Sequence, residues 1–348
     1  MVAINSANAR VWSKLGSRGT FGAAMMELGQ TSDNLMVLTA DLSTTSGLDR
    51  FKNAYPEKFL NVGIAEQNMI GIAAGMAKEG KTVFATTFAT FAAMRSYEQV
   101  RVHMGYMGLN VKVVGLASGM AMGMFGNTHY GIEDIALMRA VPGLTVLSPA
   151  DGAEIVKTVI AAAEYQGPIY IRLTGAMNNP IVYKEDYDFT IGKAVTLREG
   201  TDITILATGT MVYESLIAAK LLEDNSISAT VVNMHTIKPL DTSIIDRACK
   251  TTELIVTVEE HSVIGGLGGA VAEYKSRIAN APPQLFIGLP DMFGKNGDYK
   301  YLLEKYELTG KQIAQTIREA CICSGDLKGS ETGGKQSTWV GNNERIFG

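Results

Sequence analysis

The sequence predicts an α/β protein of two domains, each a mainly parallel sheet with helices on both faces. Short runs rich in β-branched residues alternate along the chain with longer segments of helical pattern, which is typical of crossover units between parallel strands. A chain of 348 residues has room for about two domains. The alternation lapses once, in a polar stretch between residues 175 and 193, and we expect that stretch to link the domains.

The predicted strands follow the apolar runs. The first domain is expected over residues 1–180, with strands at 34–41, 81–87, 110–117, 144–151 and 168–175. The second and smaller domain is expected over residues 190–323, with strands at 202–209, 227–234, 253–260 and 284–291. Residues 324–348 are rich in Gly, Ser, Thr and Asn, and we expect them to form a disordered tail.

Composition excludes several classes of partner. The net charge is −4, and without a basic cluster we expect neither nucleic acid nor an anionic membrane surface as a partner. No apolar run reaches the length of a membrane span and the N-terminus lacks a signal-peptide pattern, so a cytoplasmic location is expected. The three cysteines and four histidines show no metal-ligand spacing, so no metal site is predicted on this chain.

The stretch "NVGIAEQNMIGIAAGMAKEGKTVFATT", residues 61–87, is the most informative. After Ala65 its apolar residues have helical spacing, while Gly71 and Gly75 leave one face bare enough for another backbone to approach. Such a helix suits a tight subunit interface, and Glu66 in its first turn would lie near that interface. The alternative is that Glu66 only complements the positive end of the helix dipole.

Six ordered blocks carry a family resemblance. The blocks are "VGIAEQNMIGIAAGMA", "TTFATFAAMRSYEQVR", "GNTHYGIEDIALMRAVPGLTVLSPAD", "GPIYIRLTG", "NMHTIKPLD" and "EEHSVIGGLGGAVAEY". They resemble the pyrimidine-binding and C-terminal domains of transketolase-type enzymes, which depend on thiamine diphosphate, over residues 10–320 of this chain. The resemblance implies transfer of a two-carbon ketol unit from a ketose donor to an aldehyde or modified-sugar acceptor.

The resemblance also implies a cofactor site. Glu66 matches the catalytic glutamate that activates the cofactor through a hydrogen bond from its buried carboxyl group to the pyrimidine ring. Phe88 and Phe91 match aromatic residues that pack against that ring, although two phenylalanines at this spacing also suit a core. Asp41 and Ile64 match further cofactor-binding positions, and Asp41 could instead be a simple cap.

One expected part of the family pattern is missing. Family members that carry the whole site on one chain bind the diphosphate and Mg²⁺ through a GDG signature, and neither Gly-Asp step of this chain, in "NGDYK" and "SGDLK", is followed by glycine. The chain therefore resembles the C-terminal subunit of a split transketolase. We expect Mg²⁺ to be held mainly by an N-terminal transketolase subunit, in a two-plus-two heterotetramer, and the single chain to be inactive.

The substrate side departs from the family pattern. His129 matches a catalytic histidine at the reacting end of the substrate, and Arg18 and Arg172 match arginines that bind a sugar phosphate; either arginine could instead make a structural ion pair. In "SGMAMGMFGNTHYG", residues 118–131, Phe125 stands where sugar transketolases have an aspartate that binds a substrate hydroxyl. Loss of that contact predicts poor use of ordinary sugar phosphates.

The methionines of this stretch predict an adaptable apolar wall for a larger or less hydroxylated acceptor. The alternative for Met120 and Met122 is that they point into the core. Two other functions stay open: the β subunit of a 2-oxo-acid dehydrogenase or a deoxyxylulose-phosphate-synthase-like enzyme, and a non-catalytic regulatory subunit.

Overall fold

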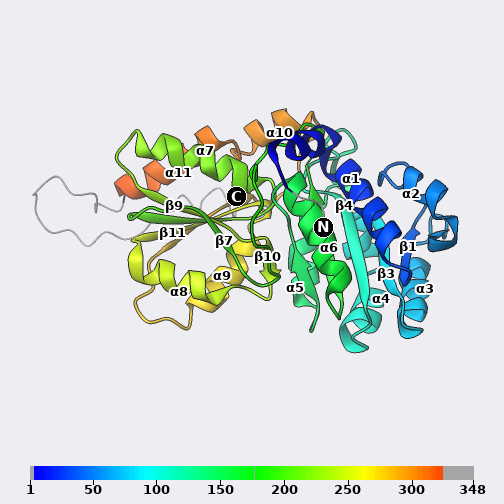
Figure 1. The fold of residues 1–348 in the computed structure, drawn as a ribbon. Coiled ribbons are helices and arrows are strands. Elements are labelled where there is room, and N and C mark those ends of the chain that lie inside the picture. The colour runs from blue at the N-terminus through cyan, green and yellow to red at the C-terminus, as the bar shows by residue number, and fades with distance from the viewer. Residues whose placement is uncertain (1–3, 176, 324–348) are drawn as a thin grey trace, which may run out of the picture.

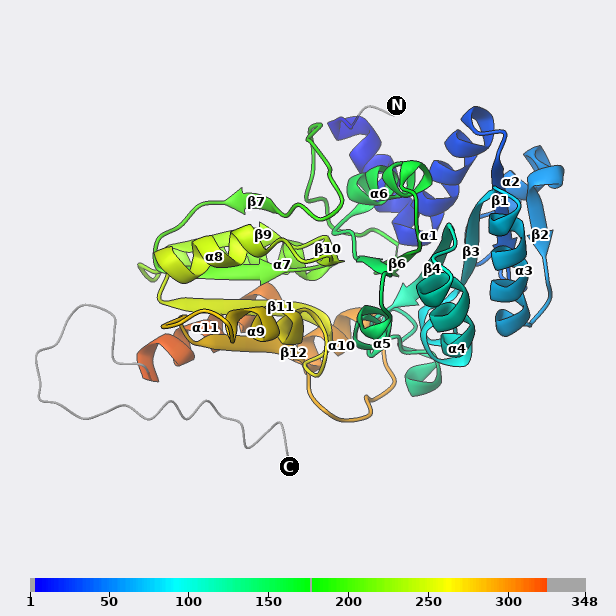
Figure 2. The ribbon, with the colours of Figure 1, turned by 90° about the horizontal axis from the view of Figure 1, so that it is seen from below.

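A computed structural model describes residues 4–175 and 177–323 of the chain. Two sheets lie side by side, and each is covered by helices on both faces (Figures 1 and 2). This arrangement confirms the predicted fold class. The predicted tail, residues 324–348, lies outside the described residues. No helix in the described ranges is long and apolar enough to cross a membrane.

The first sheet has seven strands in the order β10-β5-β6-β4-β3-β1-β2. All neighbours are parallel except β10 and β5. Every residue of β4 and β6 is buried, as expected for parallel strands with helices on both sides. The strands are β1 (Leu35–Thr39), β2 (Phe59–Asn61), β3 (Thr82–Phe88), β4 (Val111–Ser118), β5 (Thr145–Leu147), β6 (Ile169–Thr174) and β10 (Thr236–Lys238).

Two groups of helices cover this sheet. Helices α1 (Ser6–Thr31) and α6 (Gly152–Glu164) pack on one face, and α3 (Glu66–Lys78) and α5 (Asp134–Ala140) lie on the other (Figure 2). Helix α1 is bent at Gly16, whose φ of 70° is accessible to glycine at little cost. Shorter helical pieces complete the domain: α2 (Asp49–Ala54), η1 (Pro56–Lys58), η2 (Phe91–Arg95), α4 (Tyr97–Gln99), η3 (Val100–Tyr106) and η4 (Gly126–Thr128).

The second sheet has five strands in the order β12-β11-β8-β9-β7, and only β7 is antiparallel to its neighbour. Helices α7 and α11 cover one face and α8 and α9 the other (Figure 1). The elements are β7 (Val195–Arg198), β8 (Ile203–Ala207), α7 (Met211–Glu223), β9 (Ala229–Asn233), α8 (Thr242–Thr251), β11 (Leu254–Ser262), α9 (Leu267–Lys275), β12 (Gln284–Leu289), α10 (Tyr299–Lys305) and α11 (Gly310–Cys323).

The two halves share more than a linker. All nine predicted strands are present, but β2, β7 and β10 were not predicted from the sequence. Strand β10 lies beyond the predicted start of the second domain, yet it pairs with β5 and so extends the first sheet. One apolar core cluster contains Ile135 and Met138 of α5 together with Ile245 of α8 and Val271 of α9. The halves therefore share a continuous core.

At residues 175 and 177–193 the predicted linker contains neither helix nor strand, yet its backbone is held by hydrogen bonds. The carboxylate of Asp151 accepts hydrogen bonds from the backbone N–H groups of Val182 and Tyr183, each at 2.8 Å, and caps α6 through Glu154 N. Burial raises the pKa of Asp151 to about 6. The linker is therefore fixed to the first domain by a buried carboxylate.

A buried histidine between the sheets gives the fold a pH dependence. His235 is 1% exposed and stacks on Phe189, with ring centroids 4.4 Å apart. Burial lowers its pKa from 6.5 to about 4. Between these values the unfolded chain binds more protons than the folded chain, so the folded state loses stability as the pH falls from 6.5 toward 4.

We predict that His235→Asn removes this acid-side loss. Relative to the variant, the wild-type free energy of unfolding should fall by up to about 3 kcal/mol between neutral pH and the acid limit. Urea unfolding of both proteins across that range measures the difference. The wild type must be compared with the variant, because the raised pKa of Asp151 makes the folded state more stable as the pH falls, over an overlapping pH range. The difference between the two proteins isolates the contribution of His235. Parallel pH profiles for the two proteins would contradict the prediction.

Candidate active site

The predicted site residues gather at the carboxyl ends of the first sheet's parallel strands. Asp41 follows β1, Phe88 ends β3, and residues 119–131 follow β4. We call residues 119–131 the recognition loop. Ligands of open α/β sheets commonly bind outside the carboxyl ends of the strands, so the topology alone brings these segments to one edge.

Glu66 is the first residue of α3 and is only 3% exposed. Its Oε1 accepts a hydrogen bond from Arg95 Nη1 at 2.8 Å, and the Arg95 guanidinium lies 4.1 Å from the ring centroid of Phe91. Within the described residues no hydrogen bond involves Oε2 of Glu66. The carboxylate therefore has one oxygen committed to Arg95 and one available to a ligand, at a helix N-terminus that favours negative charge.

Three phenylalanines surround the histidine of the recognition loop. The His129 ring centroid lies 5.7 Å from that of Phe88, 5.4 Å from that of Phe91 and 5.0 Å from that of Phe125. Phe88 and Phe91 are themselves 5.8 Å apart in an edge-on arrangement. The structure thus brings four predicted site residues into one aromatic cluster, and Arg95 joins this cluster to Glu66.

Asp41 and Ile64 lie at the neighbouring strand ends. Asp41 has a φ of 59°, a conformation that costs energy outside glycine and is common at functional sites. Its Oδ1 accepts from Asn61 Nδ2 at 2.9 Å, and Asn61 Oδ1 accepts from the backbone of Asp41 and Gly63. This holds the turn before α3, in which Ile64 is 77% exposed.

Arg172 does not face a substrate space. It is 1% exposed, and its Nε donates to both oxygens of the buried Asp134 carboxylate at 3.0 Å. Its Nη1 donates to Thr174 Oγ1, and its Nη2 donates to the carbonyl groups of Gly131 and Glu260. This placement fits the structural ion pair that the sequence left open, and it gives no support to the predicted phosphate contact.

Arg18 lies on α1 just beyond the bend at Gly16. Its side chain is partly buried, and burial lowers the pKa of the guanidinium. Its carbonyl oxygen packs closely against Gly47, in the loop that follows β1. Arg18 thus lies near the same sheet edge, and within the described residues it makes no ion pair with a carboxylate.

The methionines of the recognition loop divide between core and surface. Met120 is 1% exposed and packs in the apolar core of the second domain, and Met122 is half-buried against the first. Met124 and Phe125 are 75% and 60% exposed. The core alternative therefore describes Met120, whereas Met124 and Phe125 form the exposed apolar part of the loop.

Several residues around the site were missed by the sequence reasoning. Arg95 pairs with Glu66, Asn61 holds Asp41, Asn127 bonds to Gly294, and Glu260 Oε1 accepts from the backbone of Met120 at 2.7 Å. Each has a partner remote in sequence. The resemblance had singled out His129 in this loop, but none of these four residues.

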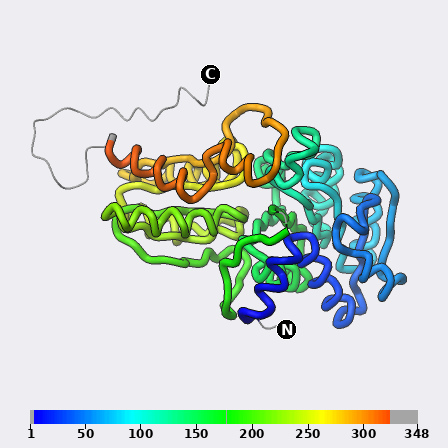
Figure 3. Tube along the Cα trace, turned by 90° about the horizontal axis from the view of Figure 1, so that it is seen from above, coloured from blue at the N-terminus to red at the C-terminus, as the bar shows by residue number. Residues whose placement is uncertain are grey.

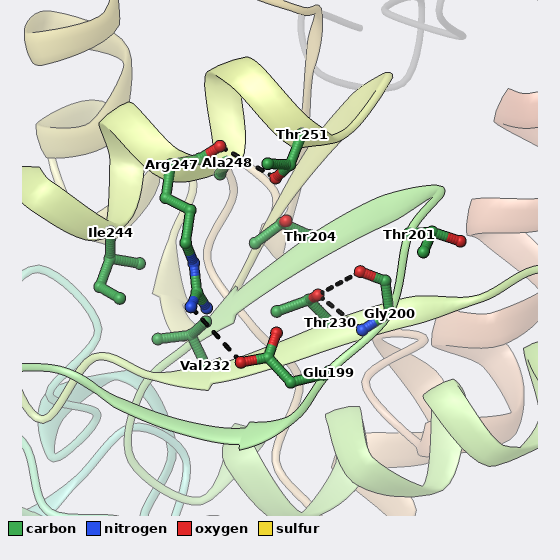
Figure 4. A pocket seen from close by; sticks show the side chains of 10 residues that line it. All are labelled: Glu199, Gly200, Thr201, Thr204, Thr230, Val232, Ile244, Arg247, Ala248 and Thr251. Carbon is green, nitrogen blue, oxygen red and sulfur yellow. Dashed lines mark hydrogen bonds and ion pairs between the residues drawn. The ribbon is translucent and has the colours of Figure 1, made fainter.

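A separate cavity of about 240 Å³ lies in the second domain, between α8 and strands β7 and β9 (Figure 4). Arg247 reaches across it toward Glu199, at 3.4 Å. The cavity shares no residue with the predicted site. Its lining is Glu199, Gly200, Thr201, Thr204, Thr230, Val232, Ile244, Arg247, Ala248 and Thr251.

The fold and the site define a two-domain α/β protein with a buried glutamate and an aromatic cluster at the carboxyl edge of its first sheet. Residues 13–178 match the family described as transketolase, pyrimidine binding domain, and residues 192–313 match transketolase, C-terminal domain. The chain belongs to the transketolase family and is a transketolase-type enzyme subunit. The family implies dependence on thiamine diphosphate.

Similar proteins are subunits of this kind. The chain is 43% identical to the 6-deoxy-6-sulfo-D-fructose transketolase subunit SqwH of Clostridium sp. (strain MSTE9), over 87% of this chain and 93% of that subunit. It is 37% identical to an apulose-4-phosphate transketolase subunit of Phocaeicola vulgatus, over 87% of this chain and 96% of that subunit. A solved structure described as a split gene transketolase, inactive beta4 tetramer, has a TM-score of 0.80 and 43% identity, covering 88% of this chain and 98% of that one.

Proposed function

We propose that the chain is the C-terminal subunit of a two-chain, thiamine-diphosphate-dependent transketolase that transfers a two-carbon ketol unit. The observation that carries the proposal is the Glu66 carboxylate, which is 3% exposed and is joined through Arg95 to the cluster of Phe88, Phe91 and His129. A flat heteroaromatic ring of this kind needs an apolar wall and a carboxyl group that can share a proton with one ring nitrogen. These residues supply both.

The donor set fits the pyrimidine end of the cofactor. We assign the unpartnered Oε2 of Glu66 to the pyrimidine ring nitrogen, while Oε1 stays on Arg95. The exposed Ile64 and the strained Asp41 stand at the adjacent strand ends and complete the cofactor-binding set. When bound, thiamine diphosphate supplies the nucleophilic carbon of the transfer reaction.

His129 is assigned to the reacting end of the substrate. Its Nδ1 lies 3.0 Å from Thr128 Oγ1, which leaves Nε2 for a substrate oxygen. The rings of Phe88, Phe91 and Phe125 limit how the imidazole can turn. A histidine held in this way can donate or accept a proton at one defined position.

The diphosphate end is assigned to a partner chain. This sequence lacks the GDG signature, so we place Mg²⁺ and the diphosphate mainly on an N-terminal transketolase subunit, in a two-plus-two assembly. The description of the solved relative as an inactive tetramer of one subunit type supports the need for a second chain. The names of the similar subunits favour a transketolase over a 2-oxo-acid dehydrogenase or a synthase, and the assembled Glu66 site favours a catalytic over a regulatory role.

We predict that the purified chain is inactive alone and gains activity when its N-terminal-half partner is added. Thiamine diphosphate binding, measured by isothermal titration calorimetry with Mg²⁺ present, should be weak for the single chain and at least about tenfold tighter for the complex. Mass spectrometry of donor and acceptor mixtures measures the transfer. Tight cofactor binding together with ketose turnover by the single chain would contradict the split assignment.

We predict that Glu66→Gln, in the complete enzyme, lowers the rate of donor cleavage by at least about a hundredfold. The amide keeps the size and a hydrogen bond but cannot exchange a proton with the pyrimidine ring. Glu79→Gln, at the exposed C-terminal end of α3, is a matched control and should have no effect. A Glu66→Gln rate within about threefold of wild type would remove Glu66 from this role.

The exposed part of the recognition loop suggests the acceptor class. Met124 and Phe125 present apolar surface where an acidic residue would bind a substrate hydroxyl. We propose an acceptor that is modified or less hydroxylated than an ordinary aldose phosphate, with Arg18 as the remaining candidate for a phosphate contact. Leaving a substrate hydroxyl unpaired against Phe125 costs about 1–3 kcal/mol.

We predict that Phe125→Asp improves the use of aldose phosphates. The added carboxylate should accept a substrate hydroxyl, which corresponds to about a tenfold gain in kcat/KM for D-ribose 5-phosphate as acceptor. Phe125→Ala controls for the loss of the ring without the new acceptor group. Steady-state rates of the complete enzyme measure both. No gain by the aspartate variant over the alanine variant would contradict the assignment of Phe125.

A further inference from the structure

The tip of the recognition loop is held by the second domain. Gly297 N donates to Gly123 O at 3.1 Å, Asn127 Nδ2 donates to Gly294 O at 2.9 Å, and Gly294 N donates to Asn127 Oδ1 at 2.7 Å. Within the described ranges, every hydrogen bond that leaves residues 122–128 for a residue outside the loop ends in residues 294–297. The segment before α10 lies beside this loop in Figure 3.

The base of the loop is held separately. Gly119 and Gly131 exchange two backbone hydrogen bonds, at 2.8 and 3.1 Å, which close the loop. Glu260 Oε1 accepts from the backbone of Met120, and the buried Arg172 donates to the carbonyl group of Gly131. These contacts fix where the loop begins and ends, but they do not reach Phe125 at its tip.

Tyr130 connects the base of the recognition loop to its tip. Its side chain is 2% exposed, and its hydroxyl donates to the carbonyl of Lys295 at 2.6 Å and approaches that of Gly123 at 3.3 Å. Lys295 N in turn donates to the Tyr306 hydroxyl at 2.7 Å, just after α10. The 294–297 segment is therefore itself anchored in the second domain and can act as a fixed support.

We propose that the 294–297 segment of the second domain is a positioning element of the substrate site, with Asn127 as the positioning residue. Asn127 stands two residues after Phe125 and two before His129. Its reciprocal amide-to-backbone pair fixes the short helix η4, and this fixes the direction of both rings. The inference rests on the proposed function of this loop and assigns to the second domain a share in acceptor recognition.

The test uses Asn127→Asp and Tyr130→Phe in the complete two-chain enzyme. Asn127→Asp keeps the size but places a carboxylate oxygen against the Gly294 carbonyl, and Tyr130→Phe removes only the hydroxyl contacts. Asn225→Asp is the matched control, because Asn225 also donates from its side chain to a backbone carbonyl, that of Leu221, on an exposed surface of the second domain. Hydroxypyruvate serves as donor, and glycolaldehyde and D-ribose 5-phosphate serve as acceptors.

We expect Asn127→Asp to raise the KM for both acceptors by about tenfold, with a smaller rise for Tyr130→Phe. The Kd for thiamine diphosphate should stay within about twofold of wild type. Hydrogen exchange should accelerate in peptides covering residues 119–131 and stay unchanged in the control. These results together would establish a positioning role that a general loss of stability cannot imitate.

Acceptor KM values and loop exchange equal to wild type in both variants would overturn the inference while leaving the proposed function intact. An equal rise in the Kd for thiamine diphosphate would also overturn it, since the effect would then be on the cofactor site. A wild-type complex that transfers no two-carbon unit overturns the proposed function. Faster loop exchange in the variants would then support only the structural contact between the loop and the second domain.

Discussion

The buried ion pair between Arg172 and Asp134 is the interaction on which the rest of the structure depends. The Arg172 side chain is 1% exposed and the Asp134 side chain is 0% exposed. Desolvating two charges costs several kcal/mol per ion, and their attraction offsets this only when the remaining donors are also satisfied. Arg172 meets that condition through Thr174 and the carbonyl groups of Gly131 and Glu260. Losing one partner would leave an uncompensated charge, at a cost of about 3–5 kcal/mol.

This requirement explains why the domains and the recognition loop form one unit. Arg172 lies on β6, Asp134 on α5, Gly131 at the end of the loop and Glu260 on β11. The hydrogen bonds of the Arg172 guanidinium therefore fix a strand and a helix of the first domain relative to a strand of the second. The Glu260 carboxylate extends the network to the backbone of Met120 and to the hydroxyl of Tyr299. A polar network that is fully satisfied specifies a single arrangement.

The sequence could predict what depends on periodicity and composition. Nine apolar runs became strands, and six of these strands are buried at every residue, which leaves a continuous apolar signal in the sequence. The three unpredicted strands are short, and β10 and β7 lie at sheet edges and pair antiparallel, so they lack that signal. Glu66, Phe88, Phe91 and His129 gather because strand ends share an edge. Arg172 was ambiguous because its partners lie 38 and 88 residues away.

The recognition loop shows why composition alone could not assign its methionines. Met120 and Met124 are the same residue type four positions apart, yet one is 1% and the other 75% exposed. The difference follows from the hydrogen bonds that hold the loop. Glu260 binds the backbone of Met120 in the second domain, whereas among the described residues the tip is held to that domain through Asn127 and Gly123. These anchors involve neither the Met124 nor the Phe125 side chain, so both exposed side chains can vary without loss of an anchor. Specificity can then change at Phe125 without disturbing the buried network that holds the loop in place.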